Sequence, residues 1–238
     1  MYDFTNKIAI ITGAMGNLGA ATVQIFQKAG AKIALVDRLE GRLQAKFLEL
    51  AGSQNFFFAE GIDLTNTESV TRMVNAVLVR FGKIDVLVNT AGGFRGGKPV
   101  HETPLASWEY LINLNARTTL VACQAIVPQM ISQNSGKIIN VAARAALGGN
   151  ANMGAYSASK AAVIRVTESL SAELKKYNIN VNCIIPGTID TPQNREAMPS
   201  SDFSRWVAPD KLAEVILFLA SPAASAIHGA AIPVFGLS

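Results

Sequence analysis

A tyrosine and a lysine stand four residues apart, at Tyr156 and Lys160, within the small-residue segment YSASK. Residues at positions i and i+4 of a helix lie on the same face, so a helix here would set the phenol beside the ammonium. Such a pair could exchange a proton with a substrate oxygen, because the positive charge favours the ionised phenol. The residues that lead up to the pair, 141–149, are mainly alanine and glycine around Arg144 and offer no hydroxyl or carboxylate.

Three glycines, Gly13, Gly16 and Gly19, follow an aliphatic run and open a helical pattern. Glycine at such a junction lets the backbone approach a pyrophosphate at the positive end of the helix. The next aliphatic run ends in Asp37, which lies 37 − 19 = 18 residues after the last glycine. A carboxylate there can accept hydrogen bonds from both hydroxyls of an adenosine ribose. The pattern predicts a dinucleotide site; a tight strand–helix turn and a helix-capping Asp37 are the plainer alternatives.

The residues around this turn favour NAD over NADP. Asp37 would repel a 2′-phosphate, and the turn itself carries Met15 and Asn17 rather than a basic side chain. Arg38, the neighbouring residue, could weaken this discrimination against NADP.

Short aliphatic runs alternate with longer amphipathic patterns along the chain. Buried strands are expected at residues 7–12, 32–37, 56–61, 84–89, 136–141 and 179–185, and helices at 18–30, 63–82, 108–131 and 155–176. The helix in 63–82 should begin with a capping box formed by Thr65 and Glu68. Strands that are apolar throughout need helices on both faces, so we expect an α/β fold with a doubly wound parallel sheet. No linker divides residues 1–238, which predicts a single domain.

Composition narrows the class of protein further. Half of the 238 residues are hydrophobic and 16% are charged, and no apolar run approaches the roughly 18 residues of a membrane span. The net charge of +4 is scattered, which argues against nucleic-acid binding. Cys123 and Cys183 lie in apolar segments, so buried free thiols and a cytoplasmic location are expected, with a disulfide between them left open. His101 and His228 have no metal-ligand spacing, and no metal is predicted.

Several further motifs carry a family resemblance. They are the turn NTAG from Asn89 to Gly92, Asp63 in GIDLT, Asn115 in INLNARTTL, and the loop from Pro186 to Thr191. With the glycine turn and YSASK, they make essentially the whole chain resemble the short-chain dehydrogenase/reductase family. The resemblance implies a single-domain Rossmann fold and an oxidoreductase that moves hydride between a nicotinamide cofactor and a small organic substrate.

The resemblance also implies roles for individual residues. Tyr156 would be the proton donor or acceptor, Lys160 would lower the pKa of the phenol, and Asn115 would hold water in a proton relay. Besides Tyr156 and Lys160, the residues implied in cofactor binding are Gly13, Met15, Gly16, Asn17, Leu18, Gly19, Asp37, Arg38, Asp63, Leu64, Asn89, Ala91, Gly92, Pro186, Gly187, Ile189 and Thr191.

Two positions depart from the family pattern. Asn17 stands where the middle glycine of the turn is usual, and asparagine tolerates left-handed backbone better than most residues. The family serine that polarises the substrate carbonyl lies thirteen residues before the tyrosine, and that position here is Ala143. Losing one such donor commonly costs about 100-fold or more in rate when an oxyanion forms.

Three readings of Ala143 remain open. The enzyme could reduce an ordinary carbonyl, with Arg144, Asn150 or Asn152 replacing the serine. It could reduce a quinonoid substrate that needs little more than a proton donor. Dihydropteridine reductases, which the segment from Ala91 to Gly97 resembles, use alanine-rich sequence before their tyrosine. It could also be a catalytically idle NAD-binding sensor or scaffold.

The segment at about 190–208 is expected to form a lid over the substrate. Candidate substrate residues are Phe94, Ala143, Met153 and Trp206, and further candidate walls are Met198 and Phe203. Arg95, Arg144, Arg195 and Arg205 could meet an anionic group, although Phe203 and Trp206 could simply pin the lid. The helices in 108–131 and 155–176 are apolar on more than one face, and the family pairs them, which suggests a homodimer or homotetramer.

Overall fold

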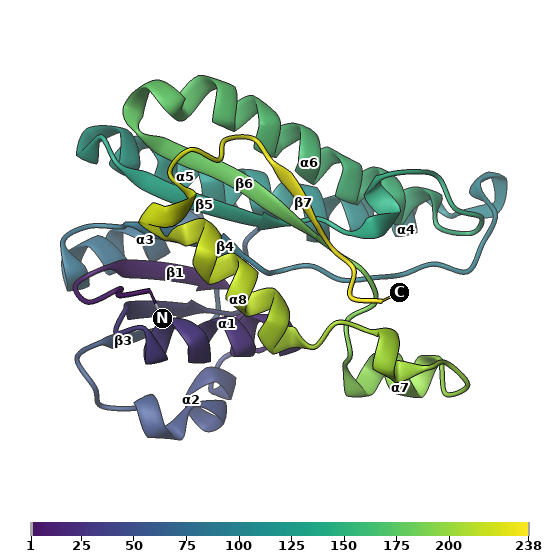
Figure 1. The fold of residues 1–238 in the computed structure, drawn as a ribbon, viewed down its shortest axis with the longest axis horizontal. Coiled ribbons are helices and arrows are strands. Elements are labelled where there is room, and N and C mark those ends of the chain that lie inside the picture. Colours follow the sequence, from purple (N-terminus) through teal and green to yellow (C-terminus); the bar gives the residue numbers. More distant parts are fainter. Residues whose placement is uncertain (1, 238) are drawn as a thin grey trace.

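The chain builds one parallel sheet with helices on both faces (Figure 1). The computed structural model describes residues 2–237. The sheet order is β3-β2-β1-β4-β5-β6-β7. Its strands are β1 (Ile8–Thr12), β2 (Lys32–Val36), β3 (Phe56–Ala59), β4 (Val86–Asn89), β5 (Gly136–Val141), β6 (Ile179–Pro186) and β7 (Ala231–Val234). Every pairing is parallel, so the predicted doubly wound Rossmann sheet is confirmed.

The helices lie in two layers. They are α1 (Asn17–Lys28), α2 (Arg42–Lys46), α3 (Thr67–Phe81), α4 (Leu105–Leu111), α5 (Thr118–Gln133), α6 (Gly154–Leu174), α7 (Pro192–Ala197) and α8 (Pro209–Ala220). Residues of α1 and α8 share one core cluster with one face of the sheet, whereas α3 and α5 share another with the opposite face. Alternation within one strand explains this division, since Ile11 packs in the first cluster and Ile10 in the second.

The order of the strands fixes where a ligand can bind. The chain leaves β1 toward β2 and β3, and then crosses back to β4 on the other side of β1. In open α/β sheets, ligands occupy the crevice at such a reversal, outside the carboxyl ends of the strands. The glycine turn after β1 and the NTAG turn after β4 both lie there.

Several predicted elements need correction. The capping box was wrong: Asn66, not Thr65, caps α3, because its side chain accepts from the Ser69 amide at 2.8 Å. The Thr65 hydroxyl instead donates to Asp63 at 2.7 Å. The expected helix over 108–131 is interrupted, since a π-helical stretch (Ile112–Arg117) separates α4 from α5.

The C-terminal part of the fold went unpredicted. Pro209 opens α8, and β7 forms the edge of the sheet beside β6. The run AIPV is short and contains a proline, which is tolerated on an edge strand because the outer side needs no ladder hydrogen bond. Cys123 and Cys183 are buried free thiols, as predicted.

Candidate active site

The glycine turn is held by very close backbone packing. Gly13 has φ +65°, and a Cβ on it would lie 2.8 Å from the backbone of Ala91. A Cβ on Gly19 would lie 2.1 Å from the Gly13 carbonyl oxygen, so α1 can approach the turn only with glycine there. Gly16, the residue before α1, has an ordinary φ of −66° and a nearest contact of 3.3 Å. The fold itself therefore requires Gly13 and Gly19 more strictly than Gly16.

The departure at Asn17 has a different explanation from the expected one. Asn17 is the first residue of α1, so the position requires no left-handed backbone. Its side-chain amide donates to the Gln193 side chain at 2.9 Å and ties the turn to α7. Leu18, next in the helix, is buried in the core.

Asp37 lies at the end of β2, where its carboxylate faces the glycine turn. One oxygen accepts from the Met15 amide at 3.2 Å, and the other accepts from the Arg38 amide at 2.8 Å. The Lys46 ammonium, which the sequence did not single out, donates to the Met15 carbonyl at 2.7 Å. Burial lowers the pKa of Lys46 and the Asp37 carboxylate opposes that shift, so the two charges lie close together.

A cavity of about 270 Å³ opens between these turns. Its lining combines the glycine turn, the end of β2, the segment after β3 and the NTAG turn, and comprises Gly13, Gly16, Asp37, Arg38, Ile62, Asp63, Leu64, Thr65, Thr90, Ala91, Gly92, Leu114 and Thr118. Two hydrogen bonds from Thr65 hold the pKa of Asp63 below its usual range, so that carboxyl is an anion at neutral pH. The cavity therefore has glycine backbone on one wall and two carboxylates on another. These features fit the adenosine and pyrophosphate of a dinucleotide.

Lys160 is the most unusual charged residue of the site. Its side chain lies in α6, and the residue is only 5% exposed. The ammonium donates to the Val141 carbonyl at 2.9 Å, and within residues 2–237 no carboxylate forms an ion pair with it. Burial lowers its pKa to about 8, although Cys183 opposes part of the shift.

Asn115 connects α6 to the NTAG turn from the π-helical stretch. Its amide donates to the Gly93 carbonyl at 3.1 Å and to the Ser159 hydroxyl at 3.0 Å, and its oxygen accepts from the Gly93 amide at 3.0 Å. A Cβ on Gly92 would lie 2.8 Å from the Asn115 oxygen and 3.1 Å from the Lys160 ammonium. The three predicted residues Gly92, Asn115 and Lys160 therefore meet at one point.

Tyr156 lies one helical turn before Lys160, beside an aromatic residue. The Phe94 ring meets its ring edge-on at 5.0 Å and 90°. Burial raises the pKa of Tyr156 to about 12. Loss of hydration around the phenol causes this rise in the chain without a cofactor, and the lowering of the Tyr156 pKa by Lys160 during the reaction stays a prediction.

Ala143 begins the turn that leads to Tyr156. Its backbone is extended, with φ −162° and ψ 158°, a conformation that serine adopts equally well. Of the three candidate replacement donors, Arg144 stacks 5.2 Å from the Phe235 ring. The Asn150 and Asn152 side chains have no hydrogen-bond partner among residues 2–237. The Asn152 backbone carbonyl accepts from the Gly97 amide, three residues after Phe94. Met153, predicted as a substrate wall, directly precedes α6.

Other predicted residues hold the framework. Asn89 is 3% exposed, and its amide donates to Asn140 at 2.9 Å across β4 and β5. Pro186 ends β6, and the Gly187 amide donates to the Val234 carbonyl of β7 at 3.1 Å. Thr191 caps α7, since its hydroxyl accepts from the Asn194 amide at 3.2 Å.

The expected lid segment is pinned at its base by a bridge between Ile189 and Val207. Its aromatic residues pack on each other, with the Phe203 and Trp206 rings 4.8 Å apart. Figure 1 draws α7 at the margin of the molecule, away from the sheet. Met198 lies just after α7 and is 39% exposed.

The candidate arginines all have other partners. Arg195 forms a two-bond ion pair with Asp190 at 2.6 and 2.7 Å, and Arg205 donates to the Leu237 carbonyl at 3.0 Å. Arg95 stacks 4.3 Å from the Tyr110 ring. Of these three arginines, only Arg195 is paired with a carboxylate of residues 2–237; Arg95 and Arg205 keep guanidinium N–H groups available to an anionic substrate group.

Comparisons with known proteins identify the family and the fold. Residues 7–202 match the family model described as short chain dehydrogenase. The 3-oxoacyl-(acyl-carrier-protein) reductase FabG of Thermotoga maritima is 33% identical over 97% of this chain and 96% of its own. The structure of NAD⁺-bound xylitol dehydrogenase superposes with a TM-score of 0.88 at 30% identity, covering 98% of this chain and 99% of that one. ElxO with NADP bound superposes with a TM-score of 0.89 at 26% identity, covering 97% of both chains.

Residues 2–237 contain neither a candidate membrane span nor a candidate metal cluster. No helix there is long and apolar enough to cross a membrane. No group of three or more His, Cys, Asp or Glu side chains is arranged to hold a metal ion.

Proposed function

The chain belongs to the short-chain dehydrogenase/reductase family, and on that premise we propose that it is an NAD(H)-dependent oxidoreductase acting on a small organic substrate. Tyr156 is the residue that exchanges a proton with the substrate. Cofactor and substrate meet at the carboxyl ends of β1, β4 and β5, where the glycine turn, the NTAG turn and the start of α6 converge.

The observation that carries this proposal is the buried ammonium of Lys160. A lysine that is 5% exposed and has no carboxylate partner costs stability. Neither the core nor the helix needs such a group, so a scaffold protein would gain by replacing it with an apolar residue. An enzyme would retain it, because a positive charge one turn below Tyr156 favours the tyrosinate during proton transfer.

The residues around the two cavity walls fit a nicotinamide dinucleotide. Gly13, Gly16 and Gly19 would lie along the pyrophosphate at the start of α1, and Asp37 would accept from the adenosine ribose. Asp63 and Leu64 would flank the adenine. The loop from Pro186 to Thr191, with Ile189 within it, would hold the nicotinamide carboxamide. When bound, the nicotinamide supplies or accepts the hydride.

The chain's own residues handle the proton. Burial raises the pKa of the Tyr156 hydroxyl, which is therefore protonated at neutral pH, and the Lys160 ammonium would offset this rise by stabilising the tyrosinate that forms when the proton is donated. Lys160 holds its position through the Val141 carbonyl, and Asn115 is fixed by Gly93 and Ser159. These contacts orient the proton-transfer groups before any substrate arrives, which lowers the cost of reaching the reactive arrangement.

Asp37 supports a preference for NADH over NADPH, but Lys46 should reduce the size of that preference. The Lys46 ammonium lies beside the same turn and is close enough to Asp37 to interact with it electrostatically. A 2′-phosphate would meet both charges. We therefore expect NADH to be preferred by a modest factor rather than NADPH being excluded.

A quinonoid substrate is a second candidate, favoured by Ala143 and Phe94. The alanine offers no hydroxyl to a developing oxyanion, and the Phe94 ring forms an apolar wall beside the Tyr156 phenol. A conjugated planar ring accepts hydride with little charge on one oxygen, so Tyr156 alone could complete its reduction. With an ordinary carbonyl substrate, Asn150 or Asn152 would have to replace the serine.

A steady-state assay separates these possibilities. NADH and NADPH oxidation would be followed with ketones, quinones, oxoacyl thioesters and quinonoid dihydropterin. We expect turnover with at least one class and a higher kcat/KM for NADH. If NADH binds tightly and no class is turned over, the protein is a sensor or scaffold.

The cytoplasmic location and the oligomeric state remain predictions. Exposed apolar residues on α4 and α5, including Leu105, Trp108 and Leu120, support pairing of these helices in a homodimer or homotetramer.

A further inference from the structure

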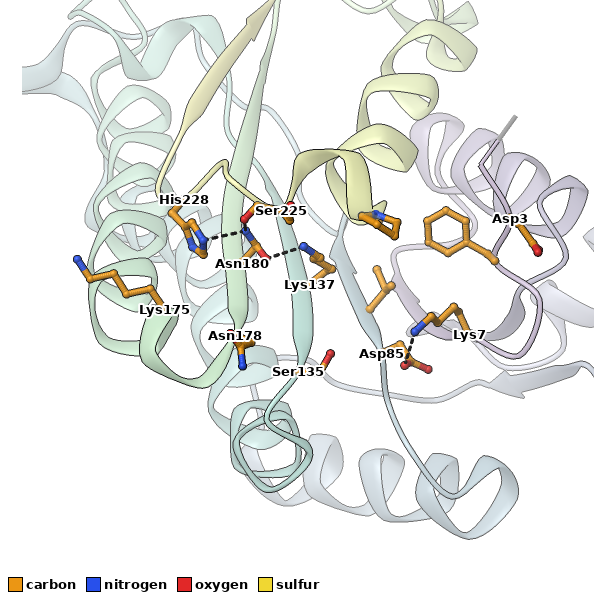
Figure 2. A pocket seen from close by; sticks show the side chains of 14 residues that line it. Asp3, Lys7, Asp85, Ser135, Lys137, Lys175, Asn178, Asn180, Ser225 and His228 are labelled. Carbon is orange, nitrogen blue, oxygen red and sulfur yellow. Dashed lines mark hydrogen bonds and ion pairs between the residues drawn. The ribbon is translucent and has the colours of Figure 1, made fainter.

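A second and larger cavity lies at the amino ends of the strands, opposite the dinucleotide cavity. Its volume is about 320 Å³, in the range from which small-molecule sites begin, at about 300 Å³. It is formed where β1, β4, β5 and β6 begin, and Figure 2 shows charged side chains entering it from these strands. The proposed active site lies at the strands' other ends. Asn180 and Pro186, at the two ends of β6, are six residues apart, which is roughly 20 Å at about 3.3 Å per residue.

Of the two carboxylates that line this cavity, Asp85 is already paired with cations. Asp85 accepts from the Ile8 amide at 2.9 Å and pairs with the ammonium groups of Lys83 at 2.9 Å and Lys7 at 3.5 Å. Asp3 accepts from the Thr5 amide at 2.8 Å. Asp85 is therefore neutralised by two lysines, whereas Asp3, at an exposed position, has no cation partner among residues 2–237.

Lys137 is a cation of this cavity that has no carboxylate partner among residues 2–237. It enters the cavity from β5, and its ammonium donates to the Asn180 side-chain oxygen at 2.5 Å (Figure 2). Among residues 2–237 no carboxylate pairs with it, so two of its three N–H groups have no protein acceptor. Partial burial and the nearby Lys7 ammonium lower its pKa. An anion beside Lys137 would relieve both effects.

Asn180 cannot turn away from Lys137 without loss. Its amide nitrogen donates to the Ser225 and Ile227 carbonyls at 2.8 and 2.9 Å, which fixes the oxygen toward the lysine. The same nitrogen lies 3.1 Å from the His228 ring (Figure 2). The ammonium is thus held in place from the protein side. Lys175 also lines the cavity, but Figure 2 draws its ammonium directed away from Lys137.

The apolar part of the lining includes Phe4, Val86 and Pro222, and the polar part also includes Ser135, Asn178 and Ser225. We propose that this cavity binds a small phosphomonoester with an apolar body, its phosphate on the ammonium groups of Lys137 and Lys7 and its body against Phe4, Val86 and Pro222. Two lysines suit a dianion better than a monoanion, because each can supply a charge-assisted hydrogen bond. The site is separate from the dinucleotide cavity and does not depend on the proposed reaction.

Isothermal titration calorimetry with phenyl phosphate tests this proposal. The ligand would be titrated into the full-length protein with and without excess NADH, and the two Kd values should agree. Phenol lacks the phosphate, inorganic phosphate lacks the apolar body, and benzoate carries a single charge. Each should bind at least about tenfold more weakly than phenyl phosphate, because each loses charge-assisted hydrogen bonds or apolar contact. Benzoate binding as tightly would overturn the choice of a dianion.

Matched lysine variants locate the site. Lys137→Gln keeps a donor for Asn180 but removes the charge, and should weaken phenyl phosphate about tenfold or more. Lys32→Gln is the control, since Lys32 is also half-buried at the beginning of a strand but lies outside the cavity. If Lys137→Gln does not fold, Lys7→Gln at an exposed position should still weaken binding severalfold. No detectable binding, or equal binding by the lysine variants and the control, would refute the proposal.

Discussion

Replacing Lys160 with methionine should stabilise the cofactor-free protein while removing its activity. The Lys160 pKa falls from its ordinary value of 10.5 to about 8 in the folded chain. That difference corresponds to about 3 kcal/mol of lost stability at pH 7, where the lysine is charged in both states. Methionine has a similar length and no charge, so Lys160→Met avoids this cost.

One contact works against the gain. The Val141 carbonyl loses its hydrogen bond from the Lys160 ammonium, and because Val141 is only half-buried this costs about 1–2 kcal/mol, the lower part of the range for an unsatisfied acceptor. The net result is a rise of about 1–2 kcal/mol in the free energy of unfolding at pH 7. For a chain of this size, that corresponds to a Tm increase of about 2–8 °C.

The direction of the Lys160 pKa shift determines how the stability of the protein changes with pH. The folded pKa lies below the unfolded one, so between pH 8 and 10.5 the unfolded chain holds the proton and the folded chain does not. The stability of the unmodified protein should therefore rise with pH across this window, relative to the variant. The advantage of Lys160→Met is largest at pH 7 and shrinks toward pH 10.

Urea denaturation at pH 7 and pH 9.5, without cofactor, measures both effects. Lys28→Met, at an exposed position in the last turn of α1, is the control and should change stability by less than about 0.5 kcal/mol. If Lys160→Met destabilised the protein by more than 1 kcal/mol and kept the same pH dependence, Lys160 would be a structural residue and the reasoning would be wrong.

Four further predictions follow from the site. Tyr156→Phe should lower NADH oxidation at least about 100-fold and leave the NADH Kd, measured by fluorescence, within about twofold; a full rate would exclude Tyr156 as proton donor. Ala143→Ser should raise kcat with an ordinary carbonyl substrate, since the backbone there accepts serine, whereas an unchanged or lower rate favours the quinonoid substrate. Gly19→Ala should lower the free energy of unfolding by about 1–3 kcal/mol, because its Cβ would lie 2.1 Å from the backbone. Gly16→Ala should cost less stability and mainly weaken NADH binding, so equal losses of stability in the two variants would contradict this reasoning. Asp37→Asn should raise the ratio of NADPH to NADH kcat/KM severalfold in steady-state assays, and an unchanged ratio would mean that Asp37 does not contact the ribose.

The sequence predicts the part of the site that depends on strand ends. Strands with continuous apolar residues fix a parallel sheet, and the turns after β1 and β4 must then meet at one edge. Gly13 and Gly92 were identified in this way, and each approaches its neighbours too closely for a Cβ. Local spacing on one helix likewise relates Tyr156 to Lys160.

Contacts made across long sequence separations could not be predicted in the same way. Lys46 reaches Met15 over 31 residues, and Asn17 reaches Gln193 over 176. Long polar side chains have many rotamers, and no spacing rule fixes their partners. Capping was also ambiguous, because Thr65 and Asn66 are adjacent and both are common cap residues. The second cavity, at the amino ends of the strands, has no sequence motif, because each of its lysines comes from a different segment of the chain.

Transfer of deuterium from cofactor to product is the most direct test of the proposed oxidoreductase. The protein would be incubated with NADH deuterated at nicotinamide C4, in both stereochemical forms, and with each substrate class, and the product would be examined by mass spectrometry. The account predicts that one form delivers a single deuterium to the product, and that Tyr156→Phe suppresses this transfer without preventing NADH binding. Tight NADH binding with no deuterium in any product would contradict it.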